Sequence, residues 1–126
     1  MTVTSLFPIL ATRDLPRIVS FYEQVLGATI DYRFPSPEGE GDAYVSLRFG
    51  AAGALGVGSD PDAAPEVPHD RIALWFYVDD VDAAFAAALR AEASEERAPT
   101  DMPWGERVAQ VREPDGNLVN LAAPPH

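Results

Sequence analysis

The sequence predicts an α+β fold in which one β-α-β-β-β unit occurs twice, and three observations support this prediction. An apolar stretch that is typical of a strand leads into an amphipathic stretch that is typical of a helix over residues 9–26, and the same succession returns over residues 75–91. An aspartate, Asp14 or Asp80, stands near the boundary in both copies. Short β-rich segments follow each predicted helix, so the order β-α-β-β-β is implied twice.

The first predicted helix covers residues 16–26. Asp14 is expected to cap it, because a carboxylate there can accept a hydrogen bond from a free N–H of the first turn and oppose the helix dipole. Pro16 suits an early helical position, where its missing N–H has no intrahelical acceptor. Gly27 is expected to end the helix. Apolar side chains recur at steps of three or four and form one face, which comprises Leu15, Ile18, Val19, Tyr22 and Leu26.

The second predicted helix covers residues 82–91, after a strand over residues 75–81. Asp80 is expected to cap it in the same way as Asp14 caps the first helix. Residues 92–103 are compatible with three structures: the end of this helix, a loop or a short strand. The apolar face of the helix comprises Val81, Ala84, Phe85, Ala88 and Leu89.

Further strands follow each helix. In the first half, residues 28–34 are β-rich and end at a break rich in proline and glycine, after which a hairpin is expected. In the second half, the turn at residues 113–117 contains a proline that presets φ and a glycine that accepts a positive φ. The strands expected beside these turns are residues 44–49 and 54–58 in the first half, and 107–112 and 118–122 in the second.

The organisation of the chain follows from this repeat. Residues 60–68 are rich in proline and acidic residues and predict a linker between module one, residues 1–59, and module two, residues 69–126. A chain of 126 residues has the size of one domain. We therefore expect a single compact domain, residues 1–126, in which the two modules share a sheet system.

Composition limits the class of partner. The chain carries nine basic residues against twenty acidic ones, and its formal charge of -11 disfavours binding to nucleic acid. It has no cysteine, which excludes disulfides, thiolate nucleophiles and zinc–thiolate sites. No apolar run is long enough to span a membrane, and none resembles a signal peptide, so we expect a soluble, cytoplasmic protein. The acidity either serves solubility or selects a cationic ligand.

Several short motifs, in their order and spacing, carry a resemblance to a known family. They are Pro8–Leu15, Phe21-Tyr22, Leu26-Gly27, Val78–Val81, Trp104-Gly105 and Pro114–Asn117. Together they resemble the vicinal oxygen chelate superfamily, which includes glyoxalase I, extradiol dioxygenases, fosfomycin-resistance enzymes and bleomycin-resistance binding proteins. The resemblance covers nearly the whole chain. It implies two tandem βαβββ modules that form a curved mixed sheet around a central cavity, and homodimers are common in the superfamily.

Strand alternation indicates which residues would line that cavity, because successive side chains of a strand point to opposite faces of the sheet. On the cavity side we expect Phe7, Ile9, Ala11, Ala73, Trp75, Tyr77 and Asn120. On the helix side we expect Ile72, Leu74, Phe76, Val78, Val119 and Leu121.

The resemblance also bears on metal binding. Metal-dependent members of the superfamily place a His or Glu on each of four strands, and these positions correspond here to Phe7, Gly56, Ala73 and Asn120. None of the four suits a divalent metal, which binds several carboxylate, imidazole or thiolate ligands. His69 is interpreted as a solvated loop residue, and the terminal His126 needs no role. We therefore expect a site without metal or cofactor.

Aromatic side chains dominate the expected pocket, where they can stack on flat ligands or face cations. Trp75 is the strongest candidate for a ligand contact, and Trp104 follows because residues 102–105 predict a mobile loop over the site; alternatively these rings belong to the core. Arg48 and Glu106 are either ligand anchors or solvated edges, and Gln110 shares a strand face with Glu106. The ligand-binding set is Phe7, Ile9, Tyr44, Arg48, Gly56, Ala73, Trp75, Tyr77, Trp104, Glu106 and Asn120.

Binding is the favoured function. The favoured hypothesis is a metal-independent protein that sequesters a hydrophobic or cationic small molecule, such as an antibiotic, and forms a homodimer, as the resemblance to bleomycin-resistance proteins implies. The alternative is an enzyme of the same superfamily, of lyase, isomerase or dioxygenase type, that uses Tyr44, Arg48 or Glu106. A structural or regulatory homodimer without a ligand is a third hypothesis. The sequence has no nucleophile elbow, phosphate loop or dinucleotide fingerprint, and no catalytic residue is assigned.

Overall fold

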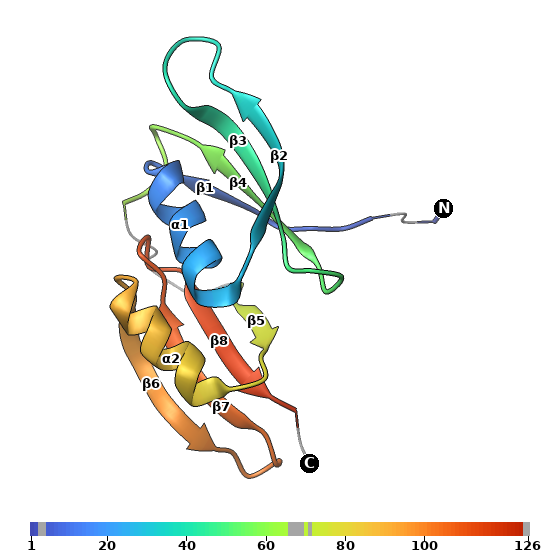
Figure 1. Cartoon of the computed structure of the whole chain (residues 1–126), viewed down its shortest axis with the longest axis vertical. Coiled ribbons are helices and arrows are strands. Elements are labelled where there is room, and N and C mark those ends of the chain that lie inside the picture. Colours follow the sequence, from blue (N-terminus) through green and yellow to red (C-terminus); the bar gives the residue numbers. More distant parts are fainter. Residues whose placement is uncertain (3–4, 66–69, 71, 125–126) are drawn as a thin grey trace. The chain divides into compact units, whose positions relative to one another are not determined.

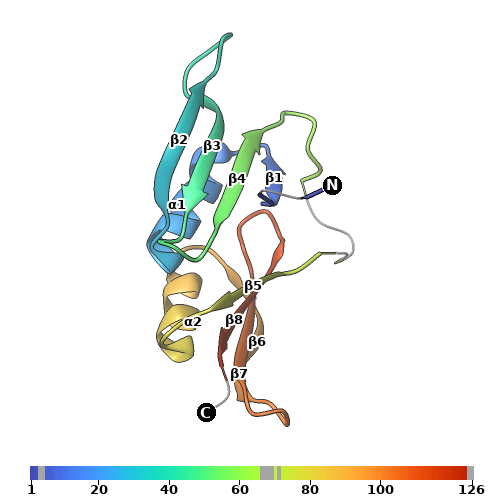
Figure 2. The same ribbon diagram turned by 90° about the vertical axis from the view of Figure 1, so that its right-hand side faces the viewer.

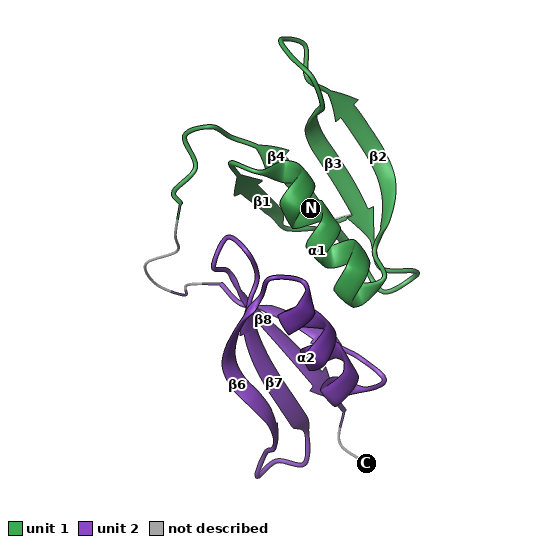
Figure 3. Cartoon of the chain, turned by 60° about the vertical axis from the view of Figure 1, so that its left-hand side comes forward, with its two compact units in different colours: residues 1–65 green, residues 66–126 purple. Residues whose placement is uncertain are grey.

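In this computed structural model, the described residues (1–2, 5–65, 70 and 72–124) form two units of the same βαβββ order, as predicted (Figure 1). The residues group by their mutual contacts into two compact units, Met1–Pro65 and Glu66–His126 (Figure 3). The division after Pro65 falls within the predicted linker. The interpretation of the whole chain as one domain stays a prediction.

The first unit contains one helix and a four-stranded sheet with the order β1-β4-β3-β2. Strand β1 runs parallel to β4, and the other pairs are antiparallel. The parallel pair joins the first and last strands of the unit, so the unit completes its own sheet. Its elements are β1 (Ile9–Thr12), α1 (Leu15–Leu26), β2 (Thr29–Pro35), β3 (Asp42–Arg48) and β4 (Ala54–Ser59).

The second unit repeats this topology with the sheet order β5-β8-β7-β6. Strand β5 is parallel to β8, while β7 is antiparallel to both of its neighbours. Among the described residues, strand pairing is thus divided between two sheets, one in each unit. The shared sheet system expected above stays a prediction. The elements are β5 (Leu74–Tyr77), α2 (Val81–Arg90), β6 (Ser94–Asp101), β7 (Arg107–Arg112) and β8 (Leu118–Ala123).

Both helices begin where the predicted aspartate caps lie, and α1 ends at the predicted glycine. The Asp14 carboxylate accepts a hydrogen bond from the Arg17 N–H at 3.3 Å, and the Asp80 carboxylate accepts one from the Ala83 N–H at 3.0 Å. Gly27 follows α1 with a φ of 67°, a left-handed conformation that glycine adopts without steric cost. Within the described chain, neither helix is long and apolar enough to cross a membrane.

Each helix packs on one face of the sheet in its own unit (Figures 1 and 2). Helix α1 lies against β3 and β4, and a fully buried apolar side chain such as Ile18 stabilises this contact by roughly 1.5–3 kcal/mol. Helix α2 lies against β6, β7 and β8. We call the other face of each sheet its helix-free face. The helix-side core is formed by Val45, Leu47, Leu55 and Val57 in the first unit and by Ala109, Val111, Val119 and Leu121 in the second.

The structure decides one point that the sequence left open and corrects one expectation. Residues 94–101, which the sequence left open, form the eight-residue strand β6. This strand is at the edge of its sheet, where polar side chains and Pro99 are tolerated because one side of the strand needs no ladder partner. Ile72 was expected to face the helix, and this was wrong: it precedes β5, and 80% of its surface is exposed.

Candidate functional site

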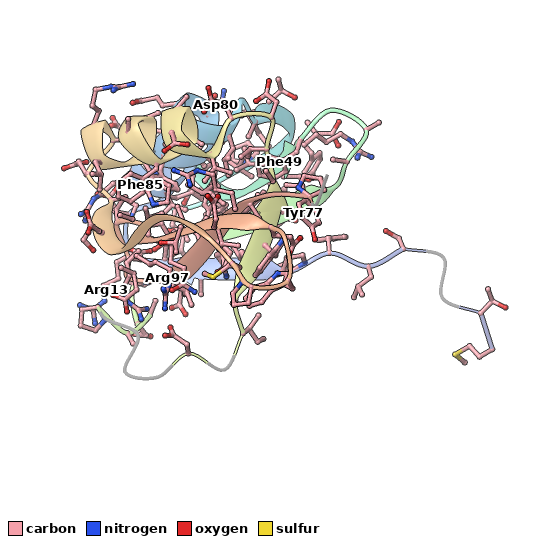
Figure 4. All side chains as sticks on the ribbon, turned by 90° about the horizontal axis from the view of Figure 1, so that it is seen from below. Arg13, Phe49, Tyr77, Asp80, Phe85 and Arg97 are labelled. Carbon is pink, nitrogen blue, oxygen red and sulfur yellow. The ribbon has the colours of Figure 1, made fainter. Side chains whose placement is uncertain are left out.

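The helix-free face of the second sheet brings together several of the predicted pocket residues. Trp75, Asn120 and Gln110 lie opposite one another on β5, β8 and β7, and Arg97 on β6 continues this row. Tyr77 occupies the next row, two residues along β5. Figure 4 shows Arg97 on the side of the sheet away from α2, whereas Phe85 belongs to that helix and lies on the other side.

Glu106 lies at the centre of an aromatic cluster on this face. Its carboxylate accepts a hydrogen bond from the Tyr77 hydroxyl at 2.6 Å and another from the Trp104 indole N–H at 2.5 Å. The Trp75 ring contacts the Tyr77 ring edge-on, with the centroids 6.1 Å apart. Only 8% of Glu106 is exposed, whereas 44% of Trp75 and 59% each of Tyr77 and Trp104 are exposed. The cluster therefore combines a shielded negative charge with accessible aromatic surface.

Local structure fixes this cluster. Trp104 lies in the turn between β6 and β7, which two backbone hydrogen bonds close: the Met102 N–H donates to the Glu106 carbonyl at 2.7 Å, and the Gly105 N–H donates to the Met102 carbonyl at 3.0 Å. Gly105 has a φ of 101°, which the turn requires. This turn directs the indole of Trp104 back to the carboxylate two residues later.

The hydrogen bond to Glu106 also affects ionisation of Tyr77. It raises the pKa of the Tyr77 phenol above its ordinary value, and desolvation and the negative charge of Glu106 act in the same direction. Tyr77 is therefore a neutral hydrogen-bond donor at physiological pH.

Two side-chain amides form the floor beside Trp75. The Asn120 amide group donates to the Leu74 carbonyl at 3.3 Å, and this contact leaves the Asn120 oxygen to accept from the Gln110 amide at 2.9 Å. Asn120 is 3% exposed, so these bonds satisfy a buried polar group. Both groups of the Asn120 amide are thus engaged within the sheet.

The other predicted site residues, in both units, do not belong to the cluster around Glu106. Ala73 is exposed and precedes β5. In the first unit, Phe7 lies ahead of β1, and Ile9 is paired with Gly56 across the parallel β1–β4 ladder. Tyr44 packs directly over Gly56. Arg48, at the end of β3, forms an ion pair with Asp31 at 3.4 Å, half exposed to solvent.

The four positions that correspond to metal ligands do not provide a donor set. Phe7 and Ala73 have no side-chain donor atom, and a Cβ added at Gly56 would lie 2.9 Å from a Tyr44 ring carbon. The Asn120 amide is engaged as described above. Among the residues that the structure describes, no three His, Asp or Glu side chains are grouped so that they could hold a metal ion. His69 and His126 lie outside the described residues.

Sequence reasoning missed two polar residues near this face or its turns. Arg97 belongs to residues 92–103, whose structure the sequence left open, and the strand register alone reveals its position. Glu113, in the β7–β8 turn, is 2% exposed, and its carboxylate accepts hydrogen bonds from two backbone N–H groups. A glutamate directly before Pro-Asp-Gly was a signal for such a role, because carboxylates often satisfy turn N–H groups.

Comparisons with known proteins agree with the fold. A family model of the Glyoxalase/Bleomycin resistance protein/Dioxygenase superfamily matches residues 4–121. No functionally curated protein sequence matches the chain significantly.

Similar solved structures come from several bacteria. A glyoxalase/bleomycin resistance protein/dioxygenase family enzyme from Burkholderia phytofirmans PsJN has 22% identity and a TM-score of 0.76, with 93% of this chain and 95% of that chain covered. TioX from Micromonospora sp. ML1 has 24% identity and a TM-score of 0.71, with 96% and 98% covered. A bleomycin resistance determinant encoded on the transposon Tn5 has 23% identity and a TM-score of 0.68, again with 96% and 98% covered. At these identities the likeness establishes a shared fold.

Proposed function

The chain belongs to the glyoxalase/bleomycin resistance protein/dioxygenase superfamily, and on this premise we propose that it is a metal-independent protein that binds a cationic organic small molecule with an apolar body. The observation that carries the proposal is the carboxylate of Glu106, 8% exposed and held by Tyr77 and Trp104 beside the accessible ring of Trp75. A shielded carboxylate next to aromatic faces is a favourable environment for an organic cation, because ring quadrupoles and the negative charge both attract it.

The hydrogen-bond partners of Glu106 support this proposal further. Both are neutral donors, and no arginine within the described ranges forms an ion pair with this carboxylate. A shielded charge without an opposite charge costs free energy. A ligand ammonium group would supply the missing positive charge, and the acidic charge of the whole chain would increase the local concentration of cations.

Metal independence rests on the donor set. A divalent metal needs several donor atoms, and these four positions do not supply them. Phe7 and Ala73 carry hydrocarbon side chains, and Gly56 has no side chain. At Asn120, the amide oxygen and nitrogen already form hydrogen bonds within the sheet. In this proposal the chain's own residues therefore perform the recognition, and no step depends on a metal.

The biological setting belongs to the same proposal. A bleomycin resistance determinant has this fold, and sequestration of an antibiotic or a similar compound would be consistent with an acidic aromatic site. We place the protein in the cytoplasm and expect a homodimer, as the sequence predicts.

Catalysis is the second candidate function, and the hydrogen bond between Tyr77 and Glu106 is the observation that favours it. A phenol and a carboxylate in contact can move a proton to or from a bound substrate. The raised pKa of Tyr77 suits an acid, not a base, at neutral pH. Turnover of a bound compound, abolished by Tyr77→Phe while binding persists, would favour this candidate over simple binding.

Calorimetric titration with benzyltrimethylammonium tests the proposal directly. We expect saturable binding to the unmodified protein and at least a roughly tenfold weaker affinity for Glu106→Gln, because the variant loses a shielded negative charge. Glu95→Gln is the matched control, since it removes the same charge from β6 at a position opposite Val111, on the helix side. Equal losses in both variants, or the absence of binding to the unmodified protein, would contradict the proposed site.

A further inference from the structure

We propose that the ligand carries a carboxylate in addition to its cationic group, and that Arg97 and Gln110 bind this carboxylate on the same helix-free face. This inference rests on the proposed function above and specifies the class of ligand: an elongated zwitterion instead of a simple cation.

A β-bulge places Arg97 on this face. Glu95 lies opposite Val111, and Arg97 lies opposite Gln110, so two steps along β6 correspond to one step along β7. Because side chains alternate along a strand, Arg97 would otherwise share the helix side with Glu95 and Val111. The extra residue, Glu96, reverses the alternation and turns Arg97 to the face of Gln110.

Arg97 differs from the other arginines of this sheet in its partners. Arg107 pairs with Asp82 and Asp101, and Arg112 pairs with Asp70 and Glu96. Within the described part of the chain, Arg97 has no acidic partner: its neighbour Glu96 is bound to Arg112 at 3.0 Å. Arg97 therefore presents beside Gln110 a positive charge that no described acidic side chain neutralises, in a protein whose formal charge is -11.

Gln110 adds a second donor. The Leu74 carbonyl accepts from the Asn120 amide group, and this orients the Asn120 oxygen towards Gln110, so the Gln110 nitrogen must be the donor in their 2.9 Å bond. An amide nitrogen carries two N–H groups, and this bond uses one of them. The other N–H and the Arg97 guanidinium form a pair of donors that suits the two oxygens of a carboxylate.

The spacing of the two charged groups sets the length of the ligand. Glu106 directly precedes β7 and is four residues from Gln110, about 13 Å along the strand direction, and Arg97 is one strand further, about 5 Å across. The backbone positions of Glu106 and Arg97 are therefore roughly 14 Å apart. Side chains of this length that lean towards each other would bring the two charges to roughly 10 Å, and this is the ligand length that the proposal takes. An α-amino acid is too short to reach both groups. Trp75 lies in the same row as Gln110 and Arg97 but on β5, at the opposite edge of the sheet from Arg97, so its ring borders the cation end of the site through its contact with Tyr77.

Three matched tripeptides test this inference. Phenylalanyl-glycyl-glycine has its amine and carboxylate about 10 Å apart when extended; its C-terminal amide lacks the negative charge, and its N-acetyl form lacks the positive charge. Their affinities are measured by titration calorimetry on the full chain, with Arg97→Gln and the control Arg90→Gln, which removes an equal charge from the end of α2.

We expect the free acid to bind the unmodified protein roughly three- to fivefold more tightly than the amide, as for a partly exposed ion pair. This difference should disappear in Arg97→Gln, persist in Arg90→Gln and shrink at high salt. Equal binding of acid and amide to the unmodified protein would overturn the carboxylate subsite and leave the cation site standing. If the N-acetyl form binds as well as the free amine, or if none of the three binds, the proposed cation site is overturned together with the subsite.

Discussion

At the scale of single residues, the carboxylate of Glu106 is held by aromatic donors instead of by an arginine. Tyr77 and Trp104 fix the orientation of both carboxylate oxygens without neutralising the charge. A fixed charge of this kind needs little rearrangement when a cation binds, and such preorganisation favours affinity.

The ionisation of Tyr77 provides the first prediction. Because the hydrogen bond to Glu106 raises the pKa of the phenol, Tyr77 should ionise above pH 10, the ordinary range for tyrosine. Glu106→Gln should lower this pKa towards the ordinary value, because the negative charge is removed. NMR titration of ring-labelled tyrosine, with Tyr77→Phe to assign the signal, measures both values.

The same pKa shift of Tyr77 makes the stability of the folded protein depend on pH. The folded-state pKa lies above that of the unfolded chain, so the Tyr77–Glu106 bond contributes to stability below about pH 10 and this contribution is lost as the pH rises through the folded-state value. Ionisation of Tyr77 at or below the ordinary value would mean that the hydrogen bond does not exist in solution.

At the scale of elements, the Tyr44 side chain of β3 lies across β4 because one position on β4 has no side chain. A Cβ at Gly56 would lie 2.9 Å from a ring carbon of Tyr44 and 3.0 Å from a side-chain carbon of Ile9. Gly58, two residues along the same strand, has open space where its Cβ would be. The glycine at 56 therefore serves the packing of Tyr44.

Gly56→Ala should consequently destabilise the protein by about 1–3 kcal/mol, since the Tyr44 ring must move. Gly58→Ala is the matched control and should change the free energy of unfolding by less than about 0.5 kcal/mol. Urea unfolding measures both. We expect that adding Tyr44→Leu to Gly56→Ala removes most of the clash. Equal effects of the two alanine substitutions would show that Tyr44 does not occupy this space.

The turn between β7 and β8 depends on a buried carboxylate. One oxygen of Glu113 accepts hydrogen bonds from the N–H groups of Asp115 and Asn117, at 2.7 Å and 3.0 Å. The other oxygen is buried and has no hydrogen-bond partner in the described structure. Burial raises the pKa of Glu113, although the backbone hydrogen bonds partly oppose this shift.

Glu113→Gln should therefore alter the pH dependence of stability. The folded state of the natural protein binds the Glu113 proton more tightly than the unfolded state, so its stability relative to the variant is greatest below about pH 4.5 and falls as the pH rises through the folded-state pKa. Urea unfolding from pH 4 to pH 8 measures this difference. Glu113→Ala, which leaves both N–H groups without the acceptor, should cost about 1–3 kcal/mol; a pH-independent difference for the Gln variant would contradict the account.

These elements also show what the sequence can and cannot predict. The helices were predicted closely because Asp14, Asp80 and Gly27 act within one turn of chain. The sequence left strand β6 open between three alternatives, because its polar sequence and its bulges make sense only at the edge of a sheet whose partner strand is known. The position of Arg97 depends on one of these bulges and was missed for the same reason.

At the scale of the whole molecule, the sequence predicted the repeated topology and the faces of the strands, but not the contacts between distant residues. Strand alternation correctly separated Trp75 and Tyr77 from Leu74 and Phe76. The hydrogen bond between Tyr77 and Glu106, however, joins residues 29 positions apart, and it depends on the pairing of β5 with β8 and of β8 with β7. The function of the candidate site therefore follows from strand register as much as from residue type.

A thermal-shift titration of metal-stripped protein in excess chelator tests the central claim most directly. We predict that benzyltrimethylammonium raises the melting temperature in a concentration-dependent way without added metal, because a ligand that binds only the folded state stabilises it. Glu106→Gln should abolish this rise. Stabilisation by nickel, zinc, manganese or iron(II) alone, with no response to the organic cation, would contradict the account and indicate a metal-dependent enzyme instead.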